Sequence, residues 1–116
     1  MASHPIVHVE IPARDRAAAT KFYGDLFGWQ TEDHAEMDYS TFAAEGGPGG
    51  GFTTSGETGK VLIFVGTDDI DASLAKVESL GGKTVQPKME IPGVGWFGTF
   101  SDPAGNTIAL YTERNQ

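Results

Sequence analysis

Apolar and polar residues alternate over residues 5–11, which predicts a first β-strand. Successive side chains of a strand point to opposite faces of its sheet. One face is therefore apolar, from Val7 to Ile11, and the other carries His8 and Glu10. We expect the apolar face to meet a helix and the two ionisable side chains to point away from it.

After this strand, apolar residues recur at helical spacing and predict a helix over residues 16–27. Asp15 is a suitable N-cap residue, and Gly28 is suitable as the left-handed residue that ends a helix. Five apolar side chains form one stripe along this helix and are predicted to be buried: Ala19, Phe22, Tyr23, Leu26 and Phe27.

The pattern then runs through three strands, a linker and a second copy of the same order. The first three strands are predicted at residues 29–34, 38–44 and 49–53, and residues 54–59 are polar and contain glycine. After a strand at 60–67, Asp69 or Asp71 is predicted to cap a helix whose buried stripe is Ile70, Leu74, Val77 and Leu80. Three last strands are predicted at 83–89, 94–100 and 106–112.

Both halves thus have the order β-α-β-β-β, and equivalent positions are 54 residues apart, as for Asp15 and Asp69 or Gly28 and Gly82. We predict a single α+β domain over residues 1–116, with module one at 5–53, a linker at 54–59 and module two at 60–113. The two βαβββ modules are expected to form a cupped eight-stranded mixed sheet or barrel with the helices outside. His8 and Glu10 would then point into its concave face.

Composition narrows the choice of partners and of chemistry. The chain has 16 acidic and 8 basic residues, a net charge of −8 and no cysteine. The acidity disfavours nucleic acids and anionic membranes, and the missing cysteines exclude disulfides, thiolate nucleophiles and cysteine-bound zinc. The N-terminal residues lack the pattern of a signal peptide, and the longest apolar run, 61–65, is too short to span a membrane. A cytoplasmic protein is expected.

Four stretches, in this order and spacing, carry a resemblance to a known superfamily. They are Val7-His-Val-Glu-Ile-Pro12, Lys21-Phe-Tyr-Gly-Asp-Leu-Phe-Gly-Trp29, the second predicted helix from Asp68 to Gly82, and Phe100-Ser-Asp-Pro-Ala-Gly-Asn106. The chain resembles the vicinal oxygen chelate superfamily, which includes glyoxalases, dioxygenases and bleomycin-resistance proteins. The resemblance implies the paired-module fold, and it implies a homodimer.

The resemblance also implies four strand positions that bind a divalent metal ion in the metal-dependent members. The first is matched by His8, whereas the second falls in the strand 49–53, which offers no histidine, carboxylate or amide. The third and fourth fall on Leu62 and Ala109. A first-row metal ion needs about three protein ligands. No metal site is therefore predicted and no cofactor is expected; a divalent metal is disfavoured, and His8 is the one matched ligand position.

Aromatic residues near these positions predict a ligand pocket. Phe64 and Tyr111 alternate in phase with Leu62 and Ala109, and further aromatic residues lie on adjoining strands. The predicted lining is His8, Glu10, Tyr39, Phe52, Leu62, Phe64, Trp96, Ala109 and Tyr111. Packing in the core is the alternative for the aromatic residues.

Two other features of the sequence are not assigned to a functional site. His34 is expected to be solvated, and the glycine run 46–51 is expected to be a flexible loop at the pocket mouth.

Three functions remain open. The first is a metal-free protein that binds a small organic ligand, without nucleic-acid or membrane partners. The second is a glyoxalase- or dioxygenase-like enzyme (lyase, isomerase or oxidoreductase), in which His8 and Glu10 act as acid and base. The third is a structural or regulatory module without catalysis. One fold hosts many functions, so the fold does not choose among them.

Overall fold

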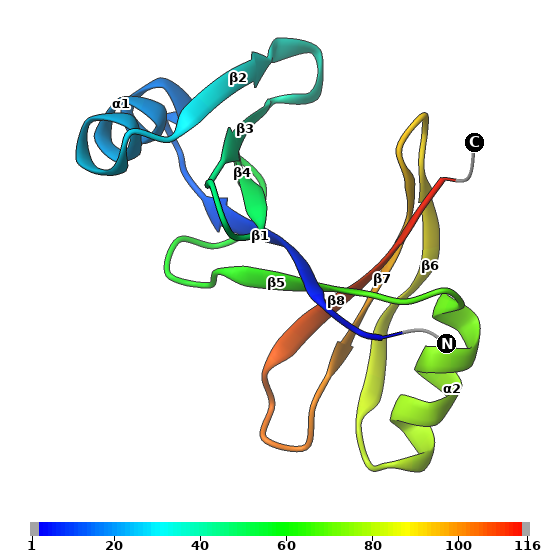
Figure 1. Cartoon of the computed structure of the whole chain (residues 1–116). Helices are drawn as coiled ribbons and strands as arrows, with labels where there is room; N and C mark the ends of the chain where they lie inside the picture. Colours follow the sequence, from blue (N-terminus) through cyan, green and yellow to red (C-terminus); the bar gives the residue numbers. More distant parts are fainter. Residues whose placement is uncertain (1–2, 115–116) are drawn as a thin grey trace. The chain divides into compact units, whose positions relative to one another are not determined.

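The computed structural model describes residues 3–114, and the order of its elements confirms two βαβββ modules and the α+β class (Figure 1). The first module consists of β1 (Ile6–Pro12), α1 (Arg16–Phe27), β2 (Gln30–His34), a 3-10 turn η1 (Ala35–Met37), β3 (Tyr39–Ala43) and β4 (Gly49–Thr53). The second consists of β5 (Leu62–Gly66), α2 (Ile70–Ser79), β6 (Lys83–Ile91), β7 (Gly95–Ser101) and β8 (Thr107–Glu113).

Two compact units divide the described residues: Val7–Ile63 in one, and 3–6 with 64–114 in the other. The strand order is β2-β3-β4-β1 in the first module and β5-β8-β7-β6 in the second. In each, one parallel pair (β1 with β4, β5 with β8) is continued by antiparallel strands, so the strand pairing of each module is mixed. None of the helices between residues 3 and 114 is long and apolar enough to cross a membrane.

Helix α1 begins and ends where the sequence predicts. The Asp15 carboxylate accepts a hydrogen bond from the Ala18 N–H at 3.0 Å, which satisfies one of the free donors of the first turn. At the other end Gly28 is left-handed, with φ 74°, and its N–H donates to the Gly24 carbonyl at 2.8 Å.

The prediction that α1 buries its apolar stripe is wrong for most of its members. Phe22, Leu26 and Phe27 are 57 to 60% exposed, and no residue of α1 is fully buried. The reason lies in the strands below, because the central strand β4 begins with three glycines and offers one large side chain to the helix, Phe52. Tyr23 covers it, with ring centroids 5.3 Å apart.

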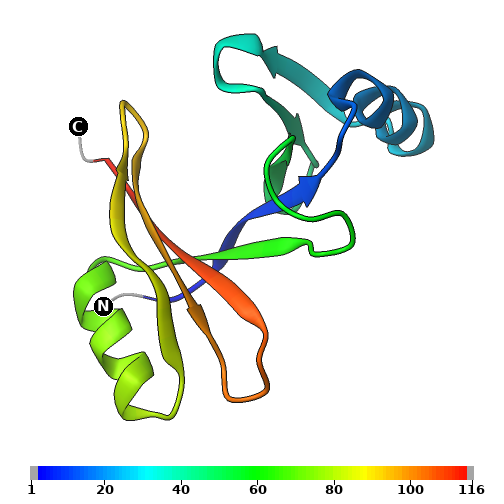
Figure 2. The same ribbon diagram turned by 180° about the vertical axis from the view of Figure 1, so that it is seen from behind.

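Helix α2 packs more closely on its sheet, and both views show it beside β6 (Figures 1 and 2). Asp69, rather than Asp71, caps it, since the Asp69 carboxylate accepts from the Ala72 N–H at 2.9 Å. Ile70 and Leu74 are buried against Leu110 of β8. The predicted burial of Leu80 is wrong, because the helix ends at Ser79 and Leu80 is 69% exposed.

Half of the glycine run expected to be a flexible loop belongs to β4, between β1 and β3, and the packing there requires glycine. A Cβ atom on Gly50 would lie 1.9 Å from the Val9 carbonyl oxygen. A Cβ atom on Gly51 would lie 2.1 Å from Cζ of the Tyr39 ring. The absence of a side chain at Gly51 therefore allows the Tyr39 ring to lie flat across the strand.

Truncating Ile70 should destabilise the protein strongly. Ile70 is 1% exposed, so Ile70→Ala loses the buried side chain and leaves a cavity, with an expected cost of about 2–5 kcal/mol in the free energy of unfolding. Leu80→Ala, at the exposed end of the same helix, should change it by less than about 0.5 kcal/mol. Urea unfolding measures both variants, and equal losses would contradict the burial described.

Gly51→Ala should displace the Tyr39 ring. The added methyl group occupies the space of the ring, and overpacking of this kind costs about 1–3 kcal/mol. Urea unfolding gives this cost, and NMR contacts between the Tyr39 and His8 rings report the displacement. The control is Gly47→Ala, where nothing lies within 4 Å of the new methyl group, so stability and ring contacts should stay unchanged. Retained contacts in Gly51→Ala would show that the ring does not depend on this glycine.

Candidate functional site

Three polar side chains meet on one face of the unit Val7–Ile63: His8 and Glu10 of β1, and Tyr39 at the start of β3. Cross-strand partners share a face, and the register pairs Glu10 with Gly51 and Tyr39 with Thr53 of the same strand β4. The Tyr39 hydroxyl oxygen lies 2.7 Å from His8 Nε2. The two rings are nearly parallel, at 15°, with centroids 6.2 Å apart.

The same hydroxyl also joins Glu10, so the three groups form a hydrogen-bonded chain. When Glu10 is ionised its carboxylate can only accept, so the single proton of the Tyr39 hydroxyl is donated to Glu10. His8 Nε2 must then donate its proton to the Tyr39 oxygen, and this assigns the Nε2–H tautomer to the neutral imidazole. The order of donation is His8 to Tyr39 to Glu10.

Burial shifts all three groups toward their neutral forms. It lowers the pKa of His8 and raises the pKa of Glu10, which the hydrogen bond from Tyr39 partly opposes. The pKa of Tyr39 is raised by burial first, and then by the charge of Glu10 and its hydrogen bond. At neutral pH the site therefore contains a neutral imidazole, a protonated phenol and at most one negative charge.

His34 extends this polar face, although a solvated side chain is expected from its place in the sequence. It is half-buried, it is the cross-strand partner of Tyr39, and its Nε2 lies 3.2 Å from the Thr41 hydroxyl. Alternation along the hairpin was the signal that could have found it, because residues paired across a turn share a face.

Two aromatic residues predicted for the pocket lie on helix-covered faces instead. Phe52 is fully buried between Tyr23 and Phe42, with ring centroids 5.3 and 5.1 Å away. Trp96 packs against the α2 core and has the guanidinium of Arg114 over its ring, 4.7 Å from the centroid. Core packing, the alternative raised for these residues, accounts for both. The face of the sheet on which each of the two side chains lies depends on strand pairing that the sequence does not specify.

Four other predicted lining residues are apolar or aromatic positions on β5 and β8. Phe64 pairs with Ala109, and both are buried, while Leu62 is half-buried. Tyr111 is half-buried, its hydroxyl donates to the Val94 carbonyl at 3.3 Å, and burial raises its pKa. A role of these residues in ligand binding stays a prediction.

The residues at the four metal-ligand positions do not fit a divalent ion. Leu62 and Ala109 have no ligand atoms, and the Thr53 hydroxyl of β4 is hydrogen-bonded to Ser55 at 2.8 Å. His8 Nε2 is directed at the Tyr39 hydroxyl. Over residues 3–114 there is no group of three or more histidine, cysteine or carboxylate side chains that could hold a metal ion.

Comparison with known proteins places this geometry in a family. Residues 8–111 match the model of the glyoxalase-like domain. A glyoxylase-like domain-containing protein of Didymella fabae is 34% identical, and the match covers 90% of each chain. The anthracycline biosynthesis protein DnrV of Streptomyces peucetius is 29% identical over 88% of this chain, which spans only 44% of that relative.

Solved structures show the same fold at low sequence identity. The hypothetical protein BH1468 of Bacillus halodurans has a TM-score of 0.75 at 12% identity, with 99% of this chain and 98% of that one covered. Methylmalonyl-CoA epimerase of Mycobacterium tuberculosis has a TM-score of 0.71 at 16% identity, with 99% and 93% covered. Both agree with the vicinal oxygen chelate fold expected from the sequence. The chain belongs to the glyoxalase-like domain family of the vicinal oxygen chelate superfamily.

Proposed function

We propose that this protein binds a small organic ligand on the face formed by His8, Glu10 and Tyr39, without a divalent metal ion. The observation that carries the proposal is the hydrogen-bonded chain through the Tyr39 hydroxyl, 2.7 Å from His8 Nε2. Ligand sites commonly combine apolar surface with a few polar groups held in fixed positions. This chain of groups is such a set, because each member is oriented by its neighbour.

The side chains favour a neutral or cationic ligand with an aromatic part. The face holds at most one charge at neutral pH, and that charge is the carboxylate of Glu10. The Tyr39 and His8 rings are nearly parallel and offer flat surface for stacking. One relative is named an anthracycline biosynthesis protein, and this supports an aromatic ligand. The match covers less than half of that protein, so the support extends to the ligand class only.

Proton transfer is a second candidate for the same face. Burial raises the pKa of Glu10, and a carboxyl group whose pKa is raised toward neutrality is suited to act as a general acid or base. In this step Glu10 takes a proton from the ligand as a carboxylate and returns it to the ligand as the carboxylic acid, while the hydrogen bond with Tyr39 holds the carboxyl group in place. The reaction would be proton abstraction or return at a ligand carbon or oxygen, with no change of oxidation state.

A ligand screen tests the binding function. 1-Naphthol and 1,4-dihydroxyanthraquinone should raise the melting temperature in a saturable way, since a ligand at 100 times its Kd adds about 2.7 kcal/mol of stability. Tyr39→Phe, which removes one hydrogen-bonding group, should weaken the affinity by up to about tenfold. His8→Ala should weaken it by at least as much.

The matched control is His4→Ala. His4 is exposed and bonds the Gly66 carbonyl at 3.0 Å, so its removal should leave the affinity unchanged. Treatment with EDTA should also leave binding unchanged, and binding restored only by added zinc or manganese would overturn the metal-free part of the proposal. Equal affinity in all three variants would place the ligand elsewhere, and no stabilisation by any compound would favour the structural or regulatory module.

The pH dependence of stability tests the raised pKa of Glu10. A carboxyl group with a higher pKa in the folded than in the unfolded protein stabilises the fold most below its unfolded value of 4.5. That contribution is lost as the pH rises through the folded value. Glu10→Gln has no such loss, so its melting temperature relative to the wild type should increase between pH 4 and pH 7. A constant difference, or one that decreases with pH, would contradict the burial of this carboxyl group.

A further inference from the structure

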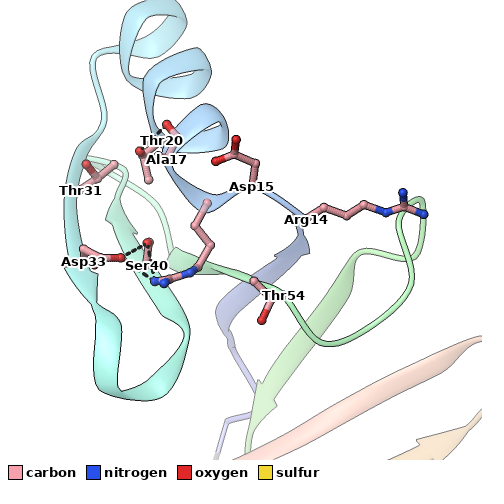
Figure 3. Close-up of a pocket in the computed structure, with 9 residues that line it drawn as sticks. Arg14, Asp15, Ala17, Thr20, Thr31, Asp33, Ser40 and Thr54 are labelled. Atoms are coloured by element: carbon pink, nitrogen blue, oxygen red, sulfur yellow. Dashed lines mark hydrogen bonds and ion pairs between the residues drawn. The ribbon is translucent and has the colours of Figure 1, made fainter.

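Arg16, the first residue of α1, reaches from the helix to the hairpin that carries Tyr39. Its side chain is 17% exposed, although it is charged. Arg16 lines a depression of about 570 Å³ at the start of the helix. Asp33 and Ser40, which line the same depression, are labelled in Figure 3. The guanidinium Nη1 donates to the Asp33 carboxylate, to the Tyr39 carbonyl at 3.0 Å and to the Ser40 hydroxyl at 3.3 Å.

The groups that Arg16 contacts fix both sides of the β2–β3 connection. Asp33 lies near the end of β2, and its Oδ1 also accepts from the Ser40 hydroxyl at 2.8 Å. Between the strands, Asp38 is the one non-glycine residue with positive φ among residues 3–114, at 51°. Its carboxylate lies 3.8 Å from Arg16 Nη2. The chain thus enters β3 through an unfavourable backbone conformation, and the half-buried guanidinium of Arg16 holds the residues around it.

Tyr39 is the residue at which this network meets the candidate site. Arg16 bonds its main-chain carbonyl, whereas its phenol lies on the opposite face of the strand from Ser40, at His8. Ser40 itself is 1% exposed, so the strand has little freedom to rotate about its own axis. The direction of the Tyr39 side chain is therefore set by contacts made behind the sheet.

We propose that Arg16 is a positioning residue, which orients the Tyr39 phenol toward His8 and Glu10 by holding the Tyr39 main chain from the helix side. The functional role of this Tyr39 orientation rests on the proposed ligand-binding function. Its test needs no ligand, so it can fail or succeed independently of ligand binding. The planar guanidinium reaches several acceptors at once, and a lysine ammonium cannot reproduce this geometry although it has the same charge.

The test uses ¹⁹F NMR of protein labelled with 3-fluorotyrosine, whose three resonances are assigned by single Tyr→Phe variants. In Arg16→Lys the Tyr39 resonance should move toward the position of free fluorotyrosine or split. Proton contacts between the Tyr39 and His8 rings should weaken in the same variant. The Tyr23 resonance, from the same unit and packed on Phe52, should stay in place and shows that this unit remains folded. The Tyr111 resonance, from the other unit, should also stay in place.

Arg14→Lys is the matched control. Arg14 is exposed and lines the same depression, so the substitution repeats the chemical change two residues away and should move no resonance. If Arg16→Lys does not fold, Asp33→Asn removes the charge of an anchor whose side chain is 60% exposed, and it should give a smaller change at Tyr39 alone. An unchanged Tyr39 resonance in folded Arg16→Lys, or an equal change in Arg14→Lys, would overturn the proposal.

Discussion

The Tyr39 ring lies over Gly51, where a Cβ atom would approach Cζ of the ring to 2.1 Å. Glycine inside a strand costs about 0.5–1 kcal/mol relative to alanine, because it loses more conformational freedom on folding. Here that cost allows the ring to lie flat on the sheet, with its hydroxyl in reach of both His8 and Glu10. The candidate site therefore depends on a position that has no side chain of its own.

This constraint explains why the face is polar without being highly charged. The buried hydroxyl needs both a donor and an acceptor, and the two ionisable residues of β1 supply one each. Burial disfavours the charged forms of both, so His8 donates as a neutral imidazole. In the proposed function, Tyr39 organises this face without a metal ion. The ligand then meets fixed hydrogen-bonding groups instead of open coordination sites.

Local signals in the sequence were sufficient to predict the helices and strands and half of the candidate site. The Asp15 carboxylate and the left-handed Gly28 bound α1 through contacts within four residues, so the chain segment itself determines the helix. The alternation in β1 likewise placed His8 and Glu10 on one face, which their shared partner Tyr39 confirms. The burial of the α1 stripe was predicted wrongly, because it depends on what β4 presents beneath the helix.

The sequence could not show which of the aromatic residues on the strands, Tyr39 or another, lies at the candidate site. Phe52, Trp96 and Tyr39 were equal candidates, since each lies on a strand of unknown register. The pairing of β3 with β4 decides between Tyr39 and Phe52, because it puts Tyr39 opposite Thr53 and Ser40 opposite Phe52, on the two different faces. A shift of one residue would exchange them. The contacts of Arg16 with Tyr39 and Ser40 lie at this point of β3, so in our proposal they hold the Tyr39 main chain on which the site depends.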